Sequence, residues 1–451
     1  MPPGALLQLA SNSPERYPVL LDSAAEGALS QGSVLAALPR GALWIDAAGR
    51  FHSQGAIAMK DPSGRFLDAF EEAWRVARQG AGELPPGLPF GGGWMVYLGY
   101  ELALQVEPKL RPFWPAASRT DARPVALALR VPAAVMTDAK GQGWLVAEPD
   151  VGEIELAAVR ADIAKASQDD RSGLAPPGAI EAIEEMPEAY IRRVERAKDF
   201  IRAGDIYQAN LSRYWRATLP AHFSAGALYA RLRQANPAPF AALAQFGDFR
   251  VLSSSPERLL RIQGRRVDTR PIAGTHPRGR TGADDRALAE ALIAHPKERA
   301  EHIMLIDLAR NDLGRVCEGG SVHVDEYMAV ETYAHVHHIV SNVTGTLRQD
   351  VTPVQALRAV FPGGTITGVP KVRCMQIIAA LEDSPRGPYT GSLGYLNHDG
   401  SGDFNILIRT ISLLGRELEF RAGAGIVADS DPARELAETR AKARGMLLAL
   451  R

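Results

Sequence analysis

Residues 406–443 read ILIRTISLLGRELEFRAGAGIVADSDPARELAETRAKA and contain two strand patterns followed by a helix pattern. Apolar residues over 406–413 and 418–423 predict two successive strands, and Ser430-Asp431-Pro432 is typical of a helix N-cap and first turn. Further short strand patterns lie at 206–211, 336–343 and 391–396. They alternate with helix patterns, but without the regular strand–helix rhythm of a parallel sheet. The sequence therefore predicts an α+β fold built on antiparallel β-sheet.

The composition restricts the class of protein. The chain has 451 residues, of which 46% are hydrophobic, and 51 Lys and Arg against 52 Asp and Glu give a formal net charge of −1. It is apolar enough to fold around a large core, and its charge provides no general attraction for nucleic acid or an anionic membrane. The start lacks a basic flank, and no run of roughly 18 apolar residues predicts a membrane span. We expect a cytoplasmic protein, in which Cys317 and Cys374 form neither a disulfide framework nor a zinc site.

A polar and then Pro/Gly-rich stretch at 167–186 divides the chain. We interpret it as a linker between an N-terminal region, 1–166, and a larger region, 187–451. On the N-terminal side, apolar residues at helical spacing predict a helix over 66–77. On the other side, a helix is predicted to begin at a proline in position 187 and to end before Gly204.

Two predicted helices carry carboxylates that could hold a cation. Glu435, Glu438 and Lys442 share one face of the C-terminal helix. An earlier helix places Glu301 and Asp307 in or beside a segment too apolar for a solvated surface, and buried carboxylates need Arg, Lys or a cation. Mg²⁺ typically takes one or two carboxylates together with water and substrate oxygens, so Glu301 with Glu435 or Glu438 would suffice. The ordinary alternative is an exposed helix with a Glu438–Lys442 ion pair.

Features that could bind an anion accompany these carboxylates. Gly423 and Gly425 are predicted to form a turn that presents backbone N–H groups, and Thr365 follows FPGG where a helix is expected to open. Arg409 lies in an apolar predicted strand, where its guanidinium needs a carboxylate from the protein or a ligand. Together these features suit a small dicarboxylate handled with Mg²⁺. A core Arg–Glu pair and a plain capped helix are the ordinary alternatives.

Three histidines lie close together in one predicted strand. Alternation places His335 and His337 on one face and His338 on the other. A metal pair at the first two lacks an evident third ligand, so exposed strand histidines are the simpler interpretation. His338, between Val336 and Val340, is expected in a core or a cleft.

Ten motifs follow one another in the larger region. They are GDIYQANLS (204–212), SSSPERLL (253–260), RPIAGTHPRG (270–279), AEHIMLIDLARNDLGRV (300–316), HIVSNVTG (338–345), FPGGTITGVPKVR (361–373), GSLGYL (391–396), IRT (408–410), AGAGIVADSDP (422–432) and ELAETRAKA (435–443). Together they resemble the chorismate-utilising enzymes, which include anthranilate, aminodeoxychorismate, isochorismate and salicylate synthases. LLDS (20–23) and FGGGWMVYLGYEL (90–102) extend a weaker resemblance into the N-terminal third. The resemblance implies a sandwich of antiparallel β-sheets covered by helices, with Mg²⁺ and chorismate between them.

The resemblance also implies a role for each candidate residue. Glu257 would act as general acid on the C4 hydroxyl, and His338 would lie beside the chorismate ring. The Mg²⁺ ligands, direct or through water, would be Glu301, Glu435 and Glu438. The residues that contact substrate would be Gln208, Thr275, Thr365, Tyr395, Arg409, Gly423, Gly425 and Lys442.

The choice of nucleophile depends on Gln208. Family members that add water resemble one another in having Lys at this position, and Gln cannot act as a base, so ammonia is the implied nucleophile. Four segments resemble aminodeoxychorismate synthase component I, which aminates C4 in the synthesis of p-aminobenzoate and folate: 207–210 (YQAN), 236–240 (NPAPF), 99–101 (GYE) and 403–406 (DFNI). Ala273 points instead to anthranilate synthase component I, which aminates C2 and expels pyruvate, because many aminodeoxychorismate synthases have Lys there.

The source of ammonia is expected to be a separate protein. Neither Cys317 nor Cys374 lies in the Gly-flanked elbow with a His partner that a glutaminase needs, so we expect a glutamine amidotransferase subunit. The LLDS and NPAPF segments depart from the LLES and NPSPY that help to form the tryptophan pocket of anthranilate synthases, which argues against feedback by tryptophan. A non-catalytic chorismate-binding relative is the other class considered. Glu257 and His338 argue against it, because a binding protein has no use for an acid aimed at C4.

Overall fold

The computed structural model describes residues 1, 4–25, 32–55, 57, 64–80, 84, 87–114, 123–168, 178–220, 224–279, 281–332 and 336–451, with the side chains at 80, 275–277, 283 and 297 left out of the description. Among the described helices, none combines the length and the apolar character that crossing a membrane would need.

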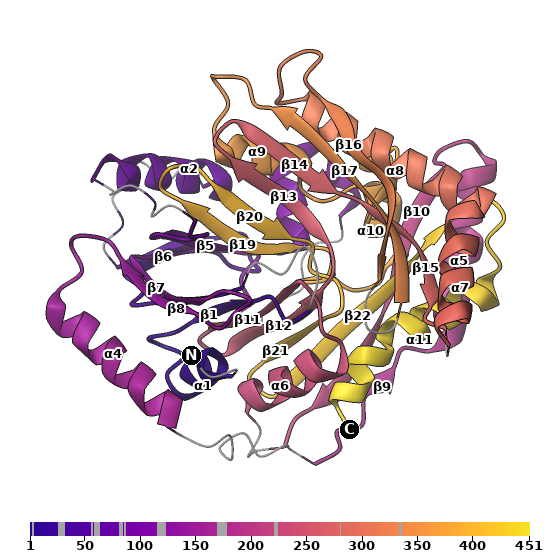
Figure 1. Ribbon diagram of the computed structural model, residues 1–451. Helices are drawn as coiled ribbons and strands as arrows, with labels where there is room; N and C mark the ends of the chain where they lie inside the picture. Colours follow the sequence, from indigo (N-terminus) through magenta and orange to yellow (C-terminus); the bar gives the residue numbers. More distant parts are fainter. Residues whose placement is uncertain are drawn as a thin grey trace.

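Two large antiparallel sheets form the centre of the molecule (Figure 1). The strands of the first sheet, in spatial order, are β18 (Gly368–Val369), β10 (Gln208–Thr218), β22 (Glu417–Ile426), β21 (Thr410–Leu414), β12 (Phe249–Ser255), β11 (Phe240–Phe246), β1 (Val19–Asp22), β2 (Ser33–Ala37), β7 (Ala133–Thr137) and β8 (Gly143–Ala147), with β9 (Ile183–Glu184) beside β10. Those of the second are β15 (Ile272–Pro277), β17 (Val336–Thr346), β14 (Arg266–Arg270), β13 (Arg258–Gln263), β20 (Gly402–Asn405), β19 (Ser392–Asn397), β5 (Gly93–Leu98), β6 (Ala126–Val131), β3 (Gly41–Ile45) and β4 (Phe51–Gly55), with β16 (His323–Thr332) beside β17. The predicted antiparallel α+β sandwich is confirmed.

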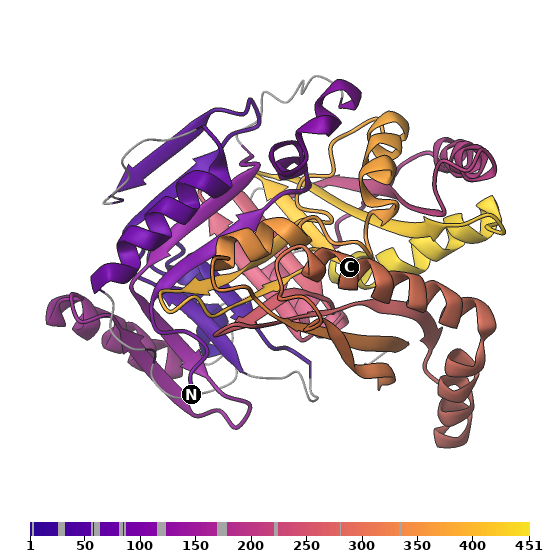
Figure 2. The same cartoon turned by 90° about the horizontal axis from the view of Figure 1, so that it is seen from above.

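A buried apolar layer joins the two sheets, and helices cover their outer faces (Figures 1 and 2). Helices α1 (Ala5–Asn12), α4 (Glu153–Gln168), α6 (Ala225–Ala235) and α11 (Pro432–Ala449) share a core with the first sheet, whereas α2 (Phe66–Ala77), α8 (Pro296–Gly314) and α9 (Pro353–Val360) share one with the second. The other described helices are α3 (Ala103–Val106), α5 (Pro187–Arg202), α7 (Gly282–Ala294), α10 (Lys371–Leu381), η1 (Arg78–Gly80), η2 (Tyr100–Leu102) and η3 (Pro108–Phe113).

The regions at 1–166 and 187–451 contribute strands to the same sheets. In the first sheet β1 pairs with β11, and in the second β5 pairs with β19. Both sheets therefore contain strands from both regions. Residues 169–177 of the predicted linker lie outside the described residues. Closer to the end of the linker, Ile183 and Glu184 form β9 and pair with β10. The exact position of the boundary stays a prediction.

Several elements have the bounds that the periodicity predicts. Helix α2 spans 66–77, α5 begins at Pro187, and Asp431 caps α11 by accepting a hydrogen bond from Arg434 N at 2.9 Å. Gly204 follows α5 with a φ of 80°, which suits glycine. Strand β10 is longer than predicted, because its alternating pattern continues to Thr218.

Candidate active site

Most of the predicted site residues lie on or next to β10, β22, β15, β17, α8 and α11, which adjoin one another at one end of the sandwich (Figure 1). The region draws on residues far apart in the sequence, because the first sheet supplies β10 and β22 whereas the second supplies β15 and β17. The two helices approach this end from opposite sheets and bring their carboxylates to it.

Gln208 at the start of β10 is held by Glu301 of α8. The Gln208 Nε2 donates a hydrogen bond to Glu301 Oε1 at 2.7 Å. The Gln208 side chain is buried, at 4% exposure, and its Oε1 has no hydrogen-bond partner among the described residues. A buried hydrogen-bond acceptor without a partner costs free energy unless a ligand supplies a donor. The pair therefore offers a fixed acceptor oxygen to a ligand with N–H groups.

The prediction that Gly423 and Gly425 form a turn is wrong, because both lie inside β22. Gly425 pairs with Asn210 and Gly423 with Ser212 on β10. The N–H groups of these two partners bond elsewhere, so in this antiparallel ladder the glycines direct their own N–H groups to the opposite edge. On that side the pairing of β22 with β21 ends at Phe420. Among the described residues these two N–H groups therefore have no strand partner, and they can donate to a carboxylate without a helix N-terminus.

The chain approaches this edge too closely for side chains. A Cβ on Gly425 would lie 2.3 Å from Gln208 Nε2, and one on Gly423 would lie 2.6 Å from the Tyr389 hydroxyl. Lys442 Nζ donates to the Gly423 carbonyl oxygen at 3.1 Å. These contacts place an ammonium group and a phenol beside the two N–H donors.

Tyr389 is a site residue that the sequence analysis missed, and Tyr395 was chosen in its place. Tyr395 on β19 packs its ring edge-on against Phe90, with 5.8 Å between ring centroids, and its charged neighbours include Asp403 and Arg258. None of the other predicted site residues is among these contacts. Both tyrosines lie in RGPYTGSLGY, and no spacing rule separates them. The proximity of Tyr389 to β22 is a tertiary contact.

Glu257 lies in the connection between β12 and β13 and is buried, at 4% exposure. Thr365 Oγ1 donates to Glu257 Oε1 at 2.6 Å, and the Glu257 carbonyl accepts from Ile406 N at 3.0 Å. Burial raises the pKa of Glu257 to about 7, although the Thr365 hydrogen bond and the charges of Arg409 and Lys442 oppose the shift. The carboxyl group therefore holds a proton at near-neutral pH, as a general acid must.

Thr365 is not at a helix N-terminus as predicted. Helix α10 begins at Lys371, after the short strand β18, and Thr365 lies in the turn before that strand. Its hydroxyl is used to hold Glu257 instead of presenting a helix dipole to an anion. The FPGG pattern thus marks a tight connection rather than a helix start.

Arg409 lies outside any strand, which corrects the sequence prediction. Strand β20 ends at Asn405 and β21 begins at Thr410, and Arg409 between them has a φ of 51°, a strained conformation for a residue with a side chain. The carbonyl of Arg409 accepts from Ser254 N at 3.1 Å. Such strain is common where a side chain must be aimed into a site.

His338 on β17 is buried beside Arg409. Its Nδ1 lies 3.0 Å from the Gly274 carbonyl oxygen, and its Nε2 lies 3.4 Å from an Arg409 guanidinium nitrogen. The carbonyl requires the proton on Nδ1, so Nε2 is the acceptor. Burial, and then the charge of Arg409, lowers the pKa of His338 to about 3. A neutral imidazole is therefore expected at the site.

The structure describes the side chain of His337, but not those of His335 and Thr275. His337, predicted to be exposed, is buried, with Nε2 2.9 Å from Asp285 Oδ1 and Nδ1 2.9 Å from Thr332 Oγ1. His335 and the side chain of Thr275 lie outside the described residues, although the backbone of Thr275 pairs with His338. His337 thus fastens α7 to the second sheet.

The carboxylates of α8 and α11 approach one another. Burial and the neighbouring charge of Glu298 raise the pKa of Glu301, and Glu438 adds to the shift. Glu298, one turn before Glu301, was not selected from the sequence. Glu435 is 8% exposed, whereas Glu438 is exposed and pairs with Lys442 at 2.7 Å. Asp307 is exposed and pairs with Arg310, so it lies beside the buried Ile306 and Leu308 without entering the core.

The fit to Mg²⁺ depends on this group of like charges. Among the described residues, no three His, Cys, Asp or Glu side chains gather closely enough to form a metal cluster. Mg²⁺ needs only one or two carboxylates, with water and substrate oxygens completing its shell. Glu301 and Glu438 repel each other across the site, and a divalent cation between them would relieve that repulsion. The donor set therefore fits Mg²⁺ bound jointly with a substrate.

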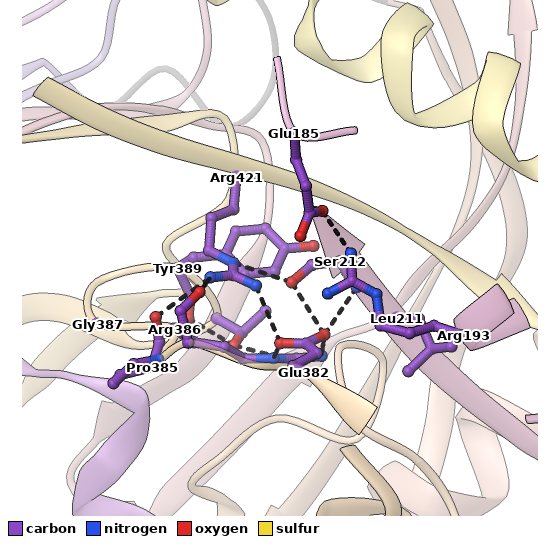
Figure 3. A network of polar contacts seen from close by, with 12 residues as sticks. Glu185, Arg193, Leu211, Ser212, Glu382, Pro385, Arg386, Gly387, Tyr389 and Arg421 are labelled. Atoms are coloured by element: carbon purple, nitrogen blue, oxygen red, sulfur yellow. Dashed lines mark hydrogen bonds and ion pairs between the residues drawn. The ribbon is translucent and has the colours of Figure 1, made fainter. Parts of the chain in front are cut away.

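A buried ion-pair network lies beside the strands that carry the site residues (Figure 3). Glu382 accepts from both guanidinium groups of Arg386 and Arg421, at 2.7 and 3.2 Å, and from the backbone and hydroxyl of Ser212 on β10. Arg421 belongs to β22, and the Arg386 guanidinium lies 5.6 Å from the Tyr389 ring centroid. The network ties together the strands that carry Gln208 and the two glycines.

Comparison with known proteins identifies the family. The chorismate binding enzyme family matches residues 38–448. The chain belongs to this family. The anthranilate synthase component I of Streptococcus pneumoniae has a similar structure, with a TM-score of 0.80 and 30% identity over 94% of this chain and 93% of that one. MenF, the menaquinone-specific isochorismate synthase of Escherichia coli, has the same fold, with a TM-score of 0.66 and 20% identity over 99% of each chain.

Proteins of similar sequence have one or the other of the two names considered above. An anthranilate synthase component I-like protein of Synechocystis is 43% identical over 81% of this chain and 74% of that protein. Anthranilate synthase component 1 of Thermus thermophilus is 50% identical and aminodeoxychorismate synthase component 1 of Bacillus subtilis 48%, each over 58% of this chain and 56% of the relative. The chain is therefore a chorismate-binding enzyme, and the two amination reactions are the candidates for its activity.

Proposed function

We propose that this chain is the ammonia-using component I of aminodeoxychorismate synthase, which replaces the C4 hydroxyl of chorismate with an amino group. The observation that supports an amination is the buried Gln208 held by Glu301. Glutamine offers no base to activate water, and its unpaired Oε1 suits an N–H donor such as ammonia. Lysine at this position would favour water.

The chemistry of the proposed reaction divides among the described side chains. Glu257 gives its proton to the C4 hydroxyl, so that the C4–O bond breaks and water leaves. Ammonia bonds to carbon, and the resulting ammonium loses a proton to give the amine. Arg409, Lys442 and the open edge of β22 provide positive charge and N–H donors for the two carboxylates of chorismate. Neutral His338 fills the space beside the ring.

Mg²⁺ is part of this proposal. Glu301, Glu435 and Glu438 would hold it together with a substrate carboxylate, and the ion when bound would neutralise charge on that carboxylate. Glu301→Ala should abolish turnover while thermal unfolding remains cooperative. Direct Mg²⁺ titration of the folded variant, by calorimetry in the presence of chorismate, should show weaker binding. Normal Mg²⁺-dependent activity would contradict this metal assignment.

The preference for C4 over C2 rests on the four segments named from the sequence. In the structure these segments are linked in two pairs. Arg386 joins 99–101 to 207–210, because its guanidinium carbon lies 4.8 Å from the Tyr100 ring centroid and its Nη2 donates to the Asn210 carbonyl oxygen at 2.6 Å. Asn405 Nδ2 donates to the Phe240 carbonyl oxygen at 3.1 Å, which joins the other two. The four similarities are therefore two independent observations in favour of C4 amination. Only one observation, Ala273, favours C2.

Anthranilate synthase component I is the second candidate, and Ala273 is the observation that favours it. Ala273 is buried on β15, one residue before Gly274, whose carbonyl oxygen contacts His338. An alanine there supplies no amine that could attack the ring. C4 amination by this chain therefore requires direct attack by ammonia or another nucleophile.

A partner that releases ammonia from glutamine is also proposed. The relatives named component 1 imply a second component. Burial raises the pKa of Cys317 to about 11 and that of Cys374 to about 12, so neither thiol is the reactive thiolate of a glutaminase. Glutamine should support turnover only when an amidotransferase subunit is added, whereas ammonium should support it alone.

The deciding experiment is product analysis. The protein is incubated with chorismate, Mg²⁺ and ammonium at high pH, with and without aminodeoxychorismate lyase, and products are resolved by chromatography. p-Aminobenzoate that forms only with the lyase supports C4 amination. Fluorescent anthranilate and pyruvate formed without the lyase would assign the chain to the second candidate. The Glu257→Gln variant serves as the inactive control.

The role of Gln208 has its own test. Gln208→Lys restores a possible base, so this variant should form some isochorismate from chorismate and water. Gln208→Leu, which removes both polar atoms, should raise the KM for ammonia without creating that activity. If Gln208→Lys forms no isochorismate, the account of this residue as the selector of ammonia is wrong.

A further inference from the structure

A small cavity lies beside Glu257, on the side that faces α8 and α9. Its volume is about 20 Å³, enough for one water molecule. Two of the described residues that line it are carboxylates, Glu257 and Asp312. Thr365, Leu305 and Ala309 also line the cavity. Of the predicted site residues, only Glu257 and Thr365 belong to this described lining. The cavity therefore reaches Glu257 from the side of α8, where Asp312 also lies.

Asp312 is a buried carboxylate that the proposed mechanism does not use. Its Oδ2 lies 2.5 Å from Lys371 Nζ at the start of α10, and the Asp312 side chain is 10% exposed. Arg315 and Glu107 are the other charged groups near it. This small exposure lets Asp312 exchange protons with solvent, while its other side borders the cavity.

We propose that one water molecule in this cavity carries protons between Asp312 and Glu257, so that Asp312 serves as the proton relay for the general acid. The inference rests on the proposed function only in requiring that the C4 hydroxyl leaves, which both candidate aminations share. The relay returns a proton to Glu257 while the reacting molecule still occupies the site.

The proton balance of the cycle closes. Glu257 protonates the departing hydroxyl, which leaves as water, and becomes a carboxylate. Asp312 takes a proton from solvent and passes it through the water to Glu257, while the ammonium formed on carbon releases one proton to solvent. The sum is chorismate plus ammonia giving the amino product plus water, with no net proton and no other reactant.

Electrostatics ease proton exchange between the two carboxyl groups. Burial raises the pKa of Asp312, against the opposing effect of Lys371, and brings it closer to that of Glu257. Two groups joined by one water exchange protons most readily when their pKa values lie close together. Arg409 and Lys442 are the charged groups with the largest effects on the pKa of Glu257, and both lower it.

The test uses chorismate consumption with ammonium as substrate, which reports loss of the C4 hydroxyl whichever product forms. Asp312→Asn should lower kcat by about tenfold or more at saturating chorismate. Formic acid, the smallest carboxylic acid, should restore part of its rate in a saturable manner, whereas imidazolium, which is too large for a cavity that holds one water molecule, should not. Asp307→Asn, a matched change at an exposed position of the same helix, should behave as the native chain.

A second variant removes the water without removing a charge. Ala309→Val places two methyl groups at the cavity, so it should lower kcat to a similar extent with KM nearly unchanged and without rescue by weak acids. If Asp312→Asn fails to fold, the double variant Asp312→Asn, Lys371→Met removes both charges together and takes its place. Native kcat in Ala309→Val, or an Asp312→Asn defect that no weak acid restores, would overturn the relay and leave Asp312 as a structural partner of Lys371.

Discussion

Two buried glutamates within the same end of the sandwich have opposite acidities. Glu382 is surrounded by Arg386, Arg421 and Ser212, and although burial opposes ionisation, the two guanidinium groups lower its pKa to about 2 (Figure 3). Among the described residues, a hydroxyl and a backbone N–H hydrogen-bond the Glu257 carboxyl group, and burial raises its pKa to about 7. Burial alone does not decide the charge of a carboxyl group; the partners at hydrogen-bond distance do.

The difference separates a structural charge from a reactive one. A paired carboxylate such as Glu382 gains from staying ionised and holds three elements in place. An unpaired one such as Glu257 gains from staying protonated, and it can give that proton to a leaving group. Removing each charge should therefore affect different properties of the protein.

The largest effect is expected for Glu257→Gln. Loss of a positioned general acid lowers kcat by about 10²–10⁴-fold. Stability should be unchanged or slightly increased, because glutamine still accepts from Thr365 and needs no proton. Steady-state rates with ammonium and thermal unfolding measure the two properties. A variant with more than about a tenth of the native rate would contradict the assignment of this acid.

Glu382→Gln should instead destabilise the fold. It leaves the guanidinium groups of Arg386 and Arg421 without their carboxylate, and breaking a buried ion pair from one side costs about 3–5 kcal/mol. Urea unfolding measures the loss. Glu153→Gln, which removes an exposed ion pair with Arg160, is the control and should change stability by less than about 0.5 kcal/mol. A similarly small change at Glu382 would mean that the network does not stabilise the fold.

The two glutamates should also give stability opposite pH dependences. From the ordinary value of 4.5, the pKa of Glu257 is raised to about 7, so the folded state holds an extra proton in that window and stability falls as pH rises through it. The pKa of Glu382 is lowered to about 2, so its contribution is complete above pH 4.5 and is lost as pH falls toward 2. Glu257→Gln should therefore remove up to about 3 kcal/mol of the decline between pH 5 and 8. An unchanged slope in urea unfolding would contradict the raised pKa.

The smallest effect is expected at the open edge of β22. Gly425→Ala introduces a Cβ that would lie 2.3 Å from Gln208 Nε2, so the amide must move away from Glu301. We expect kcat/KM for ammonia to fall about tenfold, equivalent to about 1.4 kcal/mol. Gly314→Ala, where nothing lies within 4 Å of the new Cβ, is the matched control. Equal activity of the two variants would show that Gln208 tolerates displacement.

Much of this architecture could be predicted from local patterns. Periodicity and capping residues locate α2, α5 and α11, because each depends on neighbours within one or two turns of helix. The motif sequence indicated the family, and it selected Gln208, Glu257 and Glu301 as site residues. Those three do meet at one end of the sandwich.

Other features could not be read from local patterns. Arg409 breaks an apolar run that reads as one strand, and Gly423 and Gly425 lie in a strand that reads as a turn. Tyr389 and Tyr395 are only six positions apart, yet only the first approaches the open sheet edge. In each case the competing local conformations have similar energies, and packing against distant strands selects between them.

The amino-acid order thus determined which helices form, which family the chain resembles and which chemical groups it can offer. The folded chain decided which of those groups meet. Gln208 and Glu301 are separated by 93 positions, and Glu257 and Thr365 by 108. Their acidities and hydrogen bonds depend on distance and burial, which arise only when the two sheets close on each other and exclude water.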